Sequence, residues 1–140
     1  MTTGKLSIED SLKILSDGKL GRLGCIADGE PYVVPINYFF DGEHIYVHSL
    51  AGKKINALRA NPRACLQVDE IEDSYHWRSV LVYGNYEEIH DEHLRERMLA
   101  ELFRRMPHLT PVESRMSKGS SQAIVFRLKP DSISGVGESW

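Results

Sequence analysis

The sequence predicts a mainly β fold, with antiparallel strands along most of the chain and a few flanking helices. Short stretches in which apolar and β-branched residues alternate recur from residue 20 onward, which is typical of strands. Asp-Gly pairs at 28–29 and 41–42 separate consecutive stretches, as they do in hairpin turns. Apolar residues at helical spacing are confined to three segments, near the start, around residue 55 and after residue 91. Together these observations indicate an antiparallel meander with added helices.

The composition is that of an ordinary soluble globule, with 140 residues, 41% hydrophobic, 26% charged and a net charge of −3. This length favours a single domain over residues 1–140. A net negative chain has no electrostatic reason to bind nucleic acid or an anionic membrane. No apolar run approaches the length of a membrane span, and residues 1–10 lack the apolar core of a signal peptide. We therefore expect a cytoplasmic protein with no nucleic-acid or membrane partner.

The first helix is predicted to begin after Ser7 and to end at the Asp-Gly pair at 17–18. Ser7 and the acidic residue three positions later form a capping-box pattern, and glycine is a helix stop signal. Residues 20–27 follow as a strand interrupted by two glycines, which permit a bend or the close approach of another backbone. The turn at 28–29 then joins this strand to the next one.

Residues 32–40 are almost all aromatic or β-branched, which predicts a strand with one fully apolar face. Pro35 lies in its middle, and proline is tolerated only at a sheet edge or a bulge because it lacks the N–H group. The Asp-Gly turn at 41–42 then leads into a return strand over residues 44–50. A strand edge broken by proline leaves backbone groups free, and a flat ligand lying along it could use them.

A short helix is predicted from Lys53 to the Asn-Pro pair at 61–62, because the residue before a proline is pushed out of the helical region. Gly52 precedes this helix, and Lys53 and Lys54 open it. A helix N-terminus has unpaired N–H groups and the positive end of a dipole, to which lysines add full charges. This combination predicts a phosphate site. The alternative is a pair of solvated lysines at the start of a surface helix.

After this helix the sheet is predicted to continue. Residues 63–71 form the next strand, but the four acids in positions 69–73 indicate a solvated surface loop. Residues 77–89 then supply a long strand, in which Gly84 marks a bulge.

The last third of the chain contains one more helix and one more strand. Residues 91–106 carry apolar residues at helical spacing and charged residues between them, which predicts an amphipathic helix that covers the core. Two prolines and a Ser-Lys-Gly-Ser-Ser run indicate a polar connection after it. The final strand is predicted over residues 123–128, and Pro130 closes it.

No metal or redox site is expected from the cysteines and histidines. Cys25 and Cys65 are far apart in the sequence, form no CxxC pair, and are expected to be buried, reduced thiols. His44 and His48 share a strand face but lie too far apart to chelate one ion. The chain also lacks the GxSxG, HExxH, Walker and Rossmann motifs. The sequence therefore gives no motif that would indicate a hydrolase, a metalloprotease or a nucleotide switch.

A further pattern combines several motifs between about Leu20 and Ile89. The motifs are, in order, Pro31, Val34-Pro35-Ile36, Ile45-Tyr46-Val47-His48-Ser49, Gly52-Lys53-Lys54, Asn61-Pro62 and Trp77-Arg78-Ser79-Val80-Leu81-Val82-Tyr83-Gly84. In this order and spacing they resemble the flavin-binding split-barrel superfamily. Within it they are most similar to pyridoxamine 5'-phosphate oxidase-related proteins, including the nitroimidazole-resistance type.

The resemblance implies an antiparallel split β-barrel, a homodimer, and an FMN cofactor at the interface between the two subunits. Carried over position by position, it implies that FMN is bound by residues on three strands and at one helix start. These are Val34, Pro35, Ile36 and Asn37 at the isoalloxazine ring, His48 and Ser49 at the ribityl-phosphate chain, Lys53 and Lys54 at the phosphate, and Arg78, Ser79 and Val80 from the pairing strand.

The resemblance also implies a flavin-dependent oxidoreductase, in which the cofactor carries the redox chemistry and the protein supplies orientation and electrostatics. His48 is a candidate catalytic residue, because a neutral imidazole beside an anionic flavin can hydrogen-bond it or donate a proton. True pyridoxamine phosphate oxidases are longer and carry a C-terminal RLHDR-type motif, which is absent after Phe126. We therefore expect reduction of a small organic compound, such as a nitroaromatic or a quinone, with NADH or NADPH as donor.

Two alternatives stay open at this point. Relatives of this fold bind haem or a deazaflavin, so the chain is alternatively a non-catalytic flavin- or haem-binding protein, or a deazaflavin-dependent reductase. Trp140 follows two glycines that allow the tail to fold back, so its indole could cover a flavin or bound substrate. The other reading of Trp140 is a frayed terminus without a role.

Overall fold

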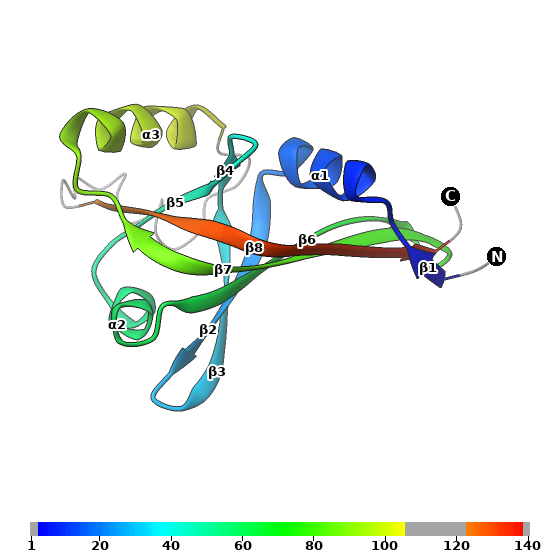
Figure 1. Ribbon diagram of the computed structural model, residues 1–140, viewed down its shortest axis with the longest axis horizontal. Coiled ribbons are helices and arrows are strands. Elements are labelled where there is room, and N and C mark those ends of the chain that lie inside the picture. The colour runs from blue at the N-terminus through cyan, green and yellow to red at the C-terminus, as the bar shows by residue number, and fades with distance from the viewer. Residues whose placement is uncertain (1–2, 106–122, 139–140) are drawn as a thin grey trace.

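The computed structural model describes residues 3–105 and 123–138. Antiparallel strands dominate these residues, and three helices accompany them (Figure 1). The elements in chain order are β1 (Thr3–Lys5), α1 (Ile8–Asp17), β2 (Leu20–Ala27), β3 (Glu30–Asn37), β4 (Phe39–Phe40), β5 (Ile45–Ser49), α2 (Lys53–Ala60), β6 (Arg63–Asp73), β7 (His76–Glu88), α3 (Glu92–Arg105) and β8 (Ile124–Glu138). The mainly β fold predicted from the sequence is confirmed.

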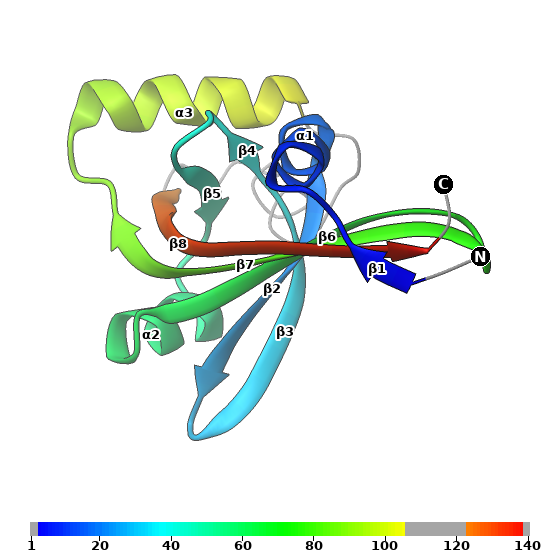
Figure 2. The same cartoon turned by 45° about the vertical axis from the view of Figure 1, so that its right-hand side comes forward.

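The sheet curls into a barrel because one residue joins its two outermost strands. The strand order is β3-β2-β6-β7-β8-β5-β4, and β1 pairs with β8. β3 ends at Asn37 and β4 begins at Phe39, so Tyr38 alone carries the chain between the two edges. Consecutive Cα atoms lie about 3.8 Å apart, so the edges must meet at this point. Away from it the β2–β3 hairpin projects from the body (Figure 2), which leaves the barrel split.

Tyr38 is fastened at this junction by two hydrogen bonds. Its side chain is almost fully buried, at 1% exposure. Its backbone N–H donates to the carbonyl of Lys19 at 2.9 Å, and its hydroxyl donates to the carbonyl of Leu15 at 2.6 Å. Leu15 belongs to α1 and Lys19 precedes β2, so the junction ties the first helix and the first long strand to the point of closure.

Alternate residues divide the sheet into a buried inner face and an outer face. In the strand register Val33, Gly24, Cys65 and Tyr83 stand in one row across β3, β2, β6 and β7, on the outer face. The residues between them along each strand point inward and form the core, to which α1 and α2 contribute side chains. Fully buried examples on the inner face are Leu23, Leu66, Val80 and Val82.

Helices α1 and α3 lie where the sequence predicts them. The Ser7 hydroxyl accepts a hydrogen bond from the backbone N–H of Asp10 at 3.0 Å, which caps α1. α3 lies across the β4–β5 hairpin (Figure 2), and its Met98 packs with Tyr46 and Val125 in a second, smaller core cluster. Within residues 3–105 and 123–138, no helix is both long and apolar enough to cross a membrane.

Local sequence signals located the turns and the sheet edge correctly. Asp28 and Gly29, with φ of 53° and 76°, take left-handed conformations in the β2–β3 turn, and Gly42 does so after β4 with φ of 99°. Pro35 lies on β3, which pairs with β2 alone among the described strands and is therefore an edge. The register between β7 and β8 shifts beside Gly84, as predicted for a bulge.

The acidic run at 69–73 was predicted as a loop, and this prediction is wrong, because these residues form the end of β6. Partners on the neighbouring strands compensate the negative charge. The guanidinium of Arg78 on β7 pairs with Glu70 at 2.6 Å, and that of Arg22 on β2 pairs with Asp69 at 3.2 Å. The strand therefore continues through the acids to the β6–β7 turn.

The last strand was predicted to stop at Pro130, but β8 runs through it to Glu138. Pro130 pairs with Gly84 at the bulge, where a missing N–H is tolerated. A Cβ at Gly84 would lie 2.6 Å from the carbonyl oxygen of Lys129, so only glycine permits this approach. The second half of β8 pairs with β1, which is three residues long and too short to show a strand pattern in the sequence.

Some predictions fall on residues outside the described part of the chain. They are the last position of the helical stripe, at residue 106, the polar connection that follows it, and the covering role of Trp140. These stay predictions.

Replacing Tyr38 by Phe should lower the free energy of unfolding by about 1–3 kcal/mol, because the carbonyl of Leu15 loses its buried donor. Chemical denaturation of the two proteins measures the difference. Tyr75→Phe is the matched control, since Tyr75 is exposed in the β6–β7 turn and its replacement should leave stability unchanged. Equal stability of Tyr38→Phe and wild type would contradict the role of this hydrogen bond.

Stability should also fall in alkaline solution. Burial raises the pKa of Tyr38 above its ordinary value of 10.0. A pKa that is higher in the folded chain adds stability that is complete below pH 10 and is lost as the pH rises through the folded value. The denaturation midpoint should therefore drop more steeply above pH 10 in wild type than in Tyr38→Phe. Parallel declines would show that Tyr38 does not contribute.

Candidate functional site

Helix α2 presents an open N-terminus. Gly52 is its N-cap residue and supplies no side-chain cap, and the first turn contains no acidic residue. The first intrahelical bond runs from the N–H of Asn56 to the carbonyl of Gly52 at 2.9 Å, so the N–H groups of the first turn have no partner within the helix. A Cβ placed on Gly52 would meet no described atom within 4 Å. An anion therefore has room to approach this end of α2.

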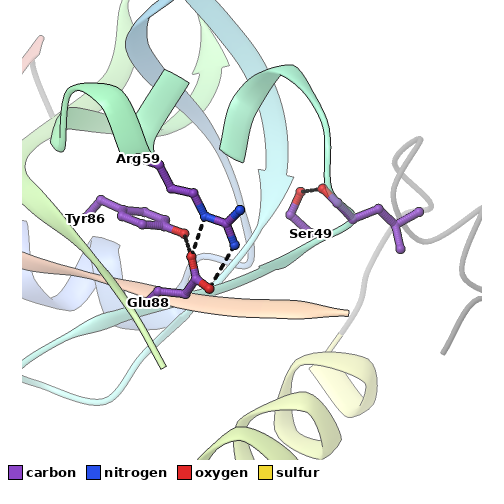
Figure 3. A network of polar contacts seen from close by, with 5 residues as sticks. Ser49, Arg59, Tyr86 and Glu88 are labelled. Carbon is purple, nitrogen blue, oxygen red and sulfur yellow. Dashed lines mark hydrogen bonds and ion pairs between the residues drawn. The ribbon is translucent and has the colours of Figure 1, made fainter. Parts of the chain in front are cut away.

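Lys54 points into the protein and meets Ser49. Lys54 is only 8% exposed, and its ammonium donates a hydrogen bond to the Ser49 hydroxyl at 3.2 Å. The hydroxyl in turn donates to the carbonyl of Leu50 at 2.9 Å (Figure 3). Burial of an ammonium is costly unless anionic or polar groups compensate it. The end of β5 and the start of α2 thus bring a buried positive charge and a hydroxyl together.

Lys53 points away from this pair, toward the β2–β3 hairpin. Its ammonium lies 4.8 Å from the centre of the Tyr32 ring, a cation–π distance. Lys53 also lines a cleft of about 390 Å³ between α2 and the hairpin, together with Asp28 and Asn56. The two lysines that the sequence predicts at one phosphate therefore make different contacts.

His48 and Ser49 are neighbours on β5, so their side chains leave opposite faces of the strand. Ser49 faces Lys54, whereas His48 is buried at 2% exposure with its ring centre 5.1 Å from that of Phe103 on α3. The structure brings the Ser49 side chain to α2 and places the His48 side chain under α3. It gives no support to His48 as a catalytic residue, and that role stays a prediction.

The four residues predicted at the isoalloxazine ring lie together on the edge strand β3. Pro35 is exposed and Val34 is half-buried, whereas Ile36 and Asn37 are buried. β3 has a partner strand on one side only among the described strands, and alternate N–H and C=O groups of an edge strand point away from that partner. A ligand lying along β3 would therefore meet backbone groups.

Arg78, Ser79 and Val80 lie on the arm of the sheet that ends in the β6–β7 turn, whereas α2 lies near the other end of the sheet (Figure 1). Arg78 pairs with Glu70, and the Ser79 hydroxyl accepts a hydrogen bond from the side-chain amide of Gln67 at 2.9 Å. The Val80 side chain is fully buried in the core. One chain therefore does not bring these three residues to α2, and a shared site requires a second copy.

An apolar groove of about 330 Å³ lies in the outer face of the sheet. Its lining includes Gly24, Ile26, Pro31, Val33, Cys65 and Tyr83. A Cβ on Gly24 would lie 2.9 Å from the sulfur of Cys65, so the glycine lets that thiol lie across β2. Most of the lining is apolar, although Asn61 and Arg63 also belong to it, so the groove suits an apolar surface more than an ion.

The two cysteines are free thiols in different surroundings. Cys25 is buried, as predicted, and burial raises the pKa of its thiol. Cys65 is only half-buried beside the groove, so the prediction that both are buried is wrong for Cys65. In the described part of the chain, no group of three or more His, Cys, Asp and Glu side chains is placed to hold a metal ion.

Most of the large exposed apolar side chains share this outer face. The strand register places five of them there, with exposures of 41% for Ile26, 64% for Val33, 69% for Ile71, 41% for Tyr83 and 43% for Val136. Ile26, Val33 and Tyr83 lie together around the groove, and exposed apolar patches often mark contact sites. The outer face is therefore a candidate contact surface.

Sequence reasoning missed several residues that line the two cavities. Tyr32 is half-buried against the core, lines the apolar groove and has the Lys53 ammonium over its ring. Asn56 lies on the side of α2 that faces the hairpin. The only available signal was the helical spacing of Lys53 and Asn56, three positions apart, which places them on one side of α2.

Comparison with known proteins identifies several similar chains. A protein-family model described as pyridoxamine 5'-phosphate oxidase matches residues 7–136. A protein of Rhizobium meliloti (strain 1021) described as uncharacterized is 34% identical in an alignment 142 positions long, which covers 93% of this chain and 91% of that protein. A crystal structure of a FAD-binding protein from Mesorhizobium loti superposes with a TM-score of 0.81 at 34% identity, covering 100% of this chain and 99% of that chain.

A more distant solved structure is that of a candidate 5-nitroimidazole antibiotic resistance protein from Bacteroides thetaiotaomicron VPI-5482. It superposes with a TM-score of 0.75 at 19% identity and covers 97% of this chain and 87% of that chain. At this identity the likeness concerns the fold alone. Both solved structures thus share the split barrel with this chain.

Proposed function

Because this chain belongs to the pyridoxamine 5'-phosphate oxidase family, as its sequence motifs predict, we propose that it is a flavin-dependent oxidoreductase that reduces a small organic compound. The observation that carries the proposal is the meeting of Ser49 and Lys54 at the open N-terminus of α2. An ammonium, a hydroxyl and backbone N–H groups that have no partner within their helix are groups that can donate hydrogen bonds to a phosphate. This donor set fits the phosphate of a flavin.

The remaining predicted residues are then assigned around that phosphate. Lys54 and Ser49 hold it together with the first N–H groups of α2, while Lys53 adds positive charge beside Tyr32. The edge of β3 offers backbone groups to the ring. We take FMN as the cofactor. The Mesorhizobium loti protein is described as FAD-binding, and FAD carries the same ring and the same first phosphate, so the mass of the released cofactor decides between them.

In the proposed reaction the flavin carries out the electron transfer and the chain binds and orients the reactants. A bound flavin supplies the redox chemistry, two-electron reduction of an acceptor such as a nitroaromatic compound or a quinone at the expense of NADH or NADPH. The chain's own residues bind and orient the flavin, since His48 is buried against Phe103 on α3 and the first turn of α2 contains no acidic residue. The cytoplasmic location predicted from the sequence stays part of this proposal.

A homodimer is part of the same proposal. Arg78 and Ser79 lie near the start of β7, next to the β6–β7 turn, and that end of the sheet is remote from α2 (Figure 1). They therefore join the cofactor site only if a second copy supplies them. The exposed apolar residues of the outer face, among them Val33 and Tyr83, supply a surface on which a second copy would bury area.

The spectrum of the purified protein tests the cofactor. A yellow preparation with flavin absorbance supports the proposal, and anaerobic addition of NADH or NADPH should bleach it. A red preparation with a Soret band would instead favour the haem-binding alternative. A colourless protein that takes up neither FMN nor FAD would contradict flavin binding altogether.

The variant Lys53→Ala/Lys54→Ala should keep the fold and lose FMN. Loss of a charge-assisted hydrogen bond weakens binding about tenfold to a hundredfold, and Lys54→Ala should account for more of the loss than Lys53→Ala. Fluorescence titration with FMN measures affinity, and circular dichroism checks the fold. Lys13→Ala/Lys129→Ala, which removes two exposed lysines elsewhere, is the matched control. Full flavin content in the folded double variant would place the phosphate site elsewhere.

The variant Val33→Glu should shift the protein from dimer to monomer and lower its flavin content, because it puts a charge into the apolar groove of the outer face. Light scattering measures the mass, and absorbance measures the flavin. Ile8→Glu is the control, since Ile8 is 59% exposed on α1 and does not belong to the outer face. A wild-type monomer that retains FMN would exclude a site shared between two subunits.

A further inference from the structure

The last turn of α2 is clamped to β7 by a carboxylate that three donors share. Arg59 on α2 donates from Nε to Glu88 Oε1 at 2.9 Å and from a terminal nitrogen to Oε2 at 3.0 Å, a bidentate arrangement. The Tyr86 hydroxyl donates to Glu88 Oε1 at 2.5 Å (Figure 3). Arg59 lies 29 positions before Glu88, so no local sequence pattern predicts this cluster.

The clamp lies at the opposite end of α2 from the Lys54–Ser49 pair. α2 has eight residues and is therefore only about 12 Å long, so it moves as a rigid body. Its middle is held by Ile55 and Leu58, which are fully buried in the core. Apolar packing tolerates small sliding, whereas a bidentate ion pair fixes both distance and direction. The position of the clamp thus determines where the first turn of α2 lies relative to Ser49.

The electrostatics of the cluster suit a fixed tether. The Arg59 guanidinium and the Tyr86 hydroxyl lower the pKa of Glu88. Burial raises the pKa of Tyr86, and the Glu88 carboxylate raises it further. Glu88 therefore stays ionised and Tyr86 stays protonated across the physiological range. The side chain of Glu88 is only 18% exposed, whereas that of Arg59 is 50% exposed. A half-exposed ion pair contributes little to overall stability, so its main effect is geometric.

We propose that Arg59, Glu88 and Tyr86 are positioning residues that hold α2 so that Lys54 and the N-terminal N–H groups of the helix meet the flavin phosphate beside Ser49. The inference rests on the proposed function, because it concerns the same phosphate. None of the three residues needs to touch the cofactor. Their effect is transmitted by the helix and is confined to the group bound at its N-terminus.

Because the effect should be limited to the phosphate bound at the N-terminus of α2, a positioning role can be distinguished from a merely structural one. FMN and riboflavin share the ring and the ribityl chain and differ in the phosphate. A loosened clamp should weaken FMN binding and leave riboflavin binding unchanged. General destabilisation of the site would weaken both to the same extent. The ratio of the two dissociation constants is therefore the diagnostic quantity.

The experiment measures both dissociation constants by fluorescence titration of the full-length protein. In Glu88→Gln the FMN affinity should fall about tenfold, the size expected for one misaligned charge-assisted hydrogen bond, with riboflavin affinity unchanged. Arg59→Lys, which keeps the charge and loses the bidentate geometry, should show the same loss, and Tyr86→Phe a smaller one. These two carry the test if Glu88→Gln does not fold.

Glu87→Gln is the matched control. Glu87 precedes Glu88 on β7 and pairs with Arg127 on β8. The variant therefore removes an ion pair from the same strand without touching α2. It should leave the FMN-to-riboflavin ratio at the wild-type value. The inference is supported if the ratio of the FMN dissociation constant to the riboflavin dissociation constant rises in Glu88→Gln and stays unchanged in Glu87→Gln.

Three outcomes overturn it, in distinguishable ways. Unchanged affinities for both FMN and riboflavin in folded Glu88→Gln and Arg59→Lys remove the positioning role and leave flavin binding intact. An equal loss of FMN and riboflavin assigns the cluster to general stability. A wild-type protein that binds riboflavin as tightly as FMN shows that the phosphate is not recognised at all, which overturns the proposed phosphate site and this inference with it.

Discussion

The closure of the sheet at Tyr38 is the constraint on which the rest of the structure depends. β3 and β4 stand at opposite ends of the strand order, yet only Tyr38 separates them along the chain. The sheet must therefore curl until its edges meet, and the buried Tyr38 hydroxyl on the Leu15 carbonyl secures that meeting against α1. Since β4 pairs with β5, closure also fixes the position of β5 and of Ser49 at its end.

The candidate site is a consequence of that geometry. The chain leaves β5 at Ser49 and enters α2 four residues later, so the short link brings the open N-terminus of the helix next to the end of the strand. Lys54 is buried against Ser49, and the Arg59–Glu88 pair fastens the other end of α2 to β7. A helix held at both ends can present its first N–H groups, which have no partner within the helix, in a fixed direction, and a phosphate site needs this property.

Features with a local physical cause could be predicted from the sequence. A left-handed residue pair in the β2–β3 turn requires residues such as Asp and Gly, a serine cap satisfies an N-terminal N–H of α1, and Pro35 cannot occupy a central strand. Features that depend on a distant partner could not. The acids at 69–73 remain in a strand because Arg78 and Arg22 face them, and β8 passes Pro130 because Gly84 lies opposite.

The same distinction applies to the site. The order of Gly52, Lys53 and Lys54 predicts an anion site at the helix start, but their spacing did not reveal that one lysine turns inward to Ser49 and the other outward to Tyr32. The alternation of β5 separates His48 from Ser49, a consequence that adjacency in sequence conceals. Contacts between residues far apart in the chain, such as that of Arg59 with Glu88, become visible only in the folded protein.

A crystal structure of the protein loaded with FMN tests the central claim most directly. The account predicts that phosphate oxygens lie within about 2.7–3.2 Å of the Lys54 ammonium, the Ser49 hydroxyl and a backbone N–H of the first turn of α2. FMN bound with its phosphate away from the start of α2 would contradict the account.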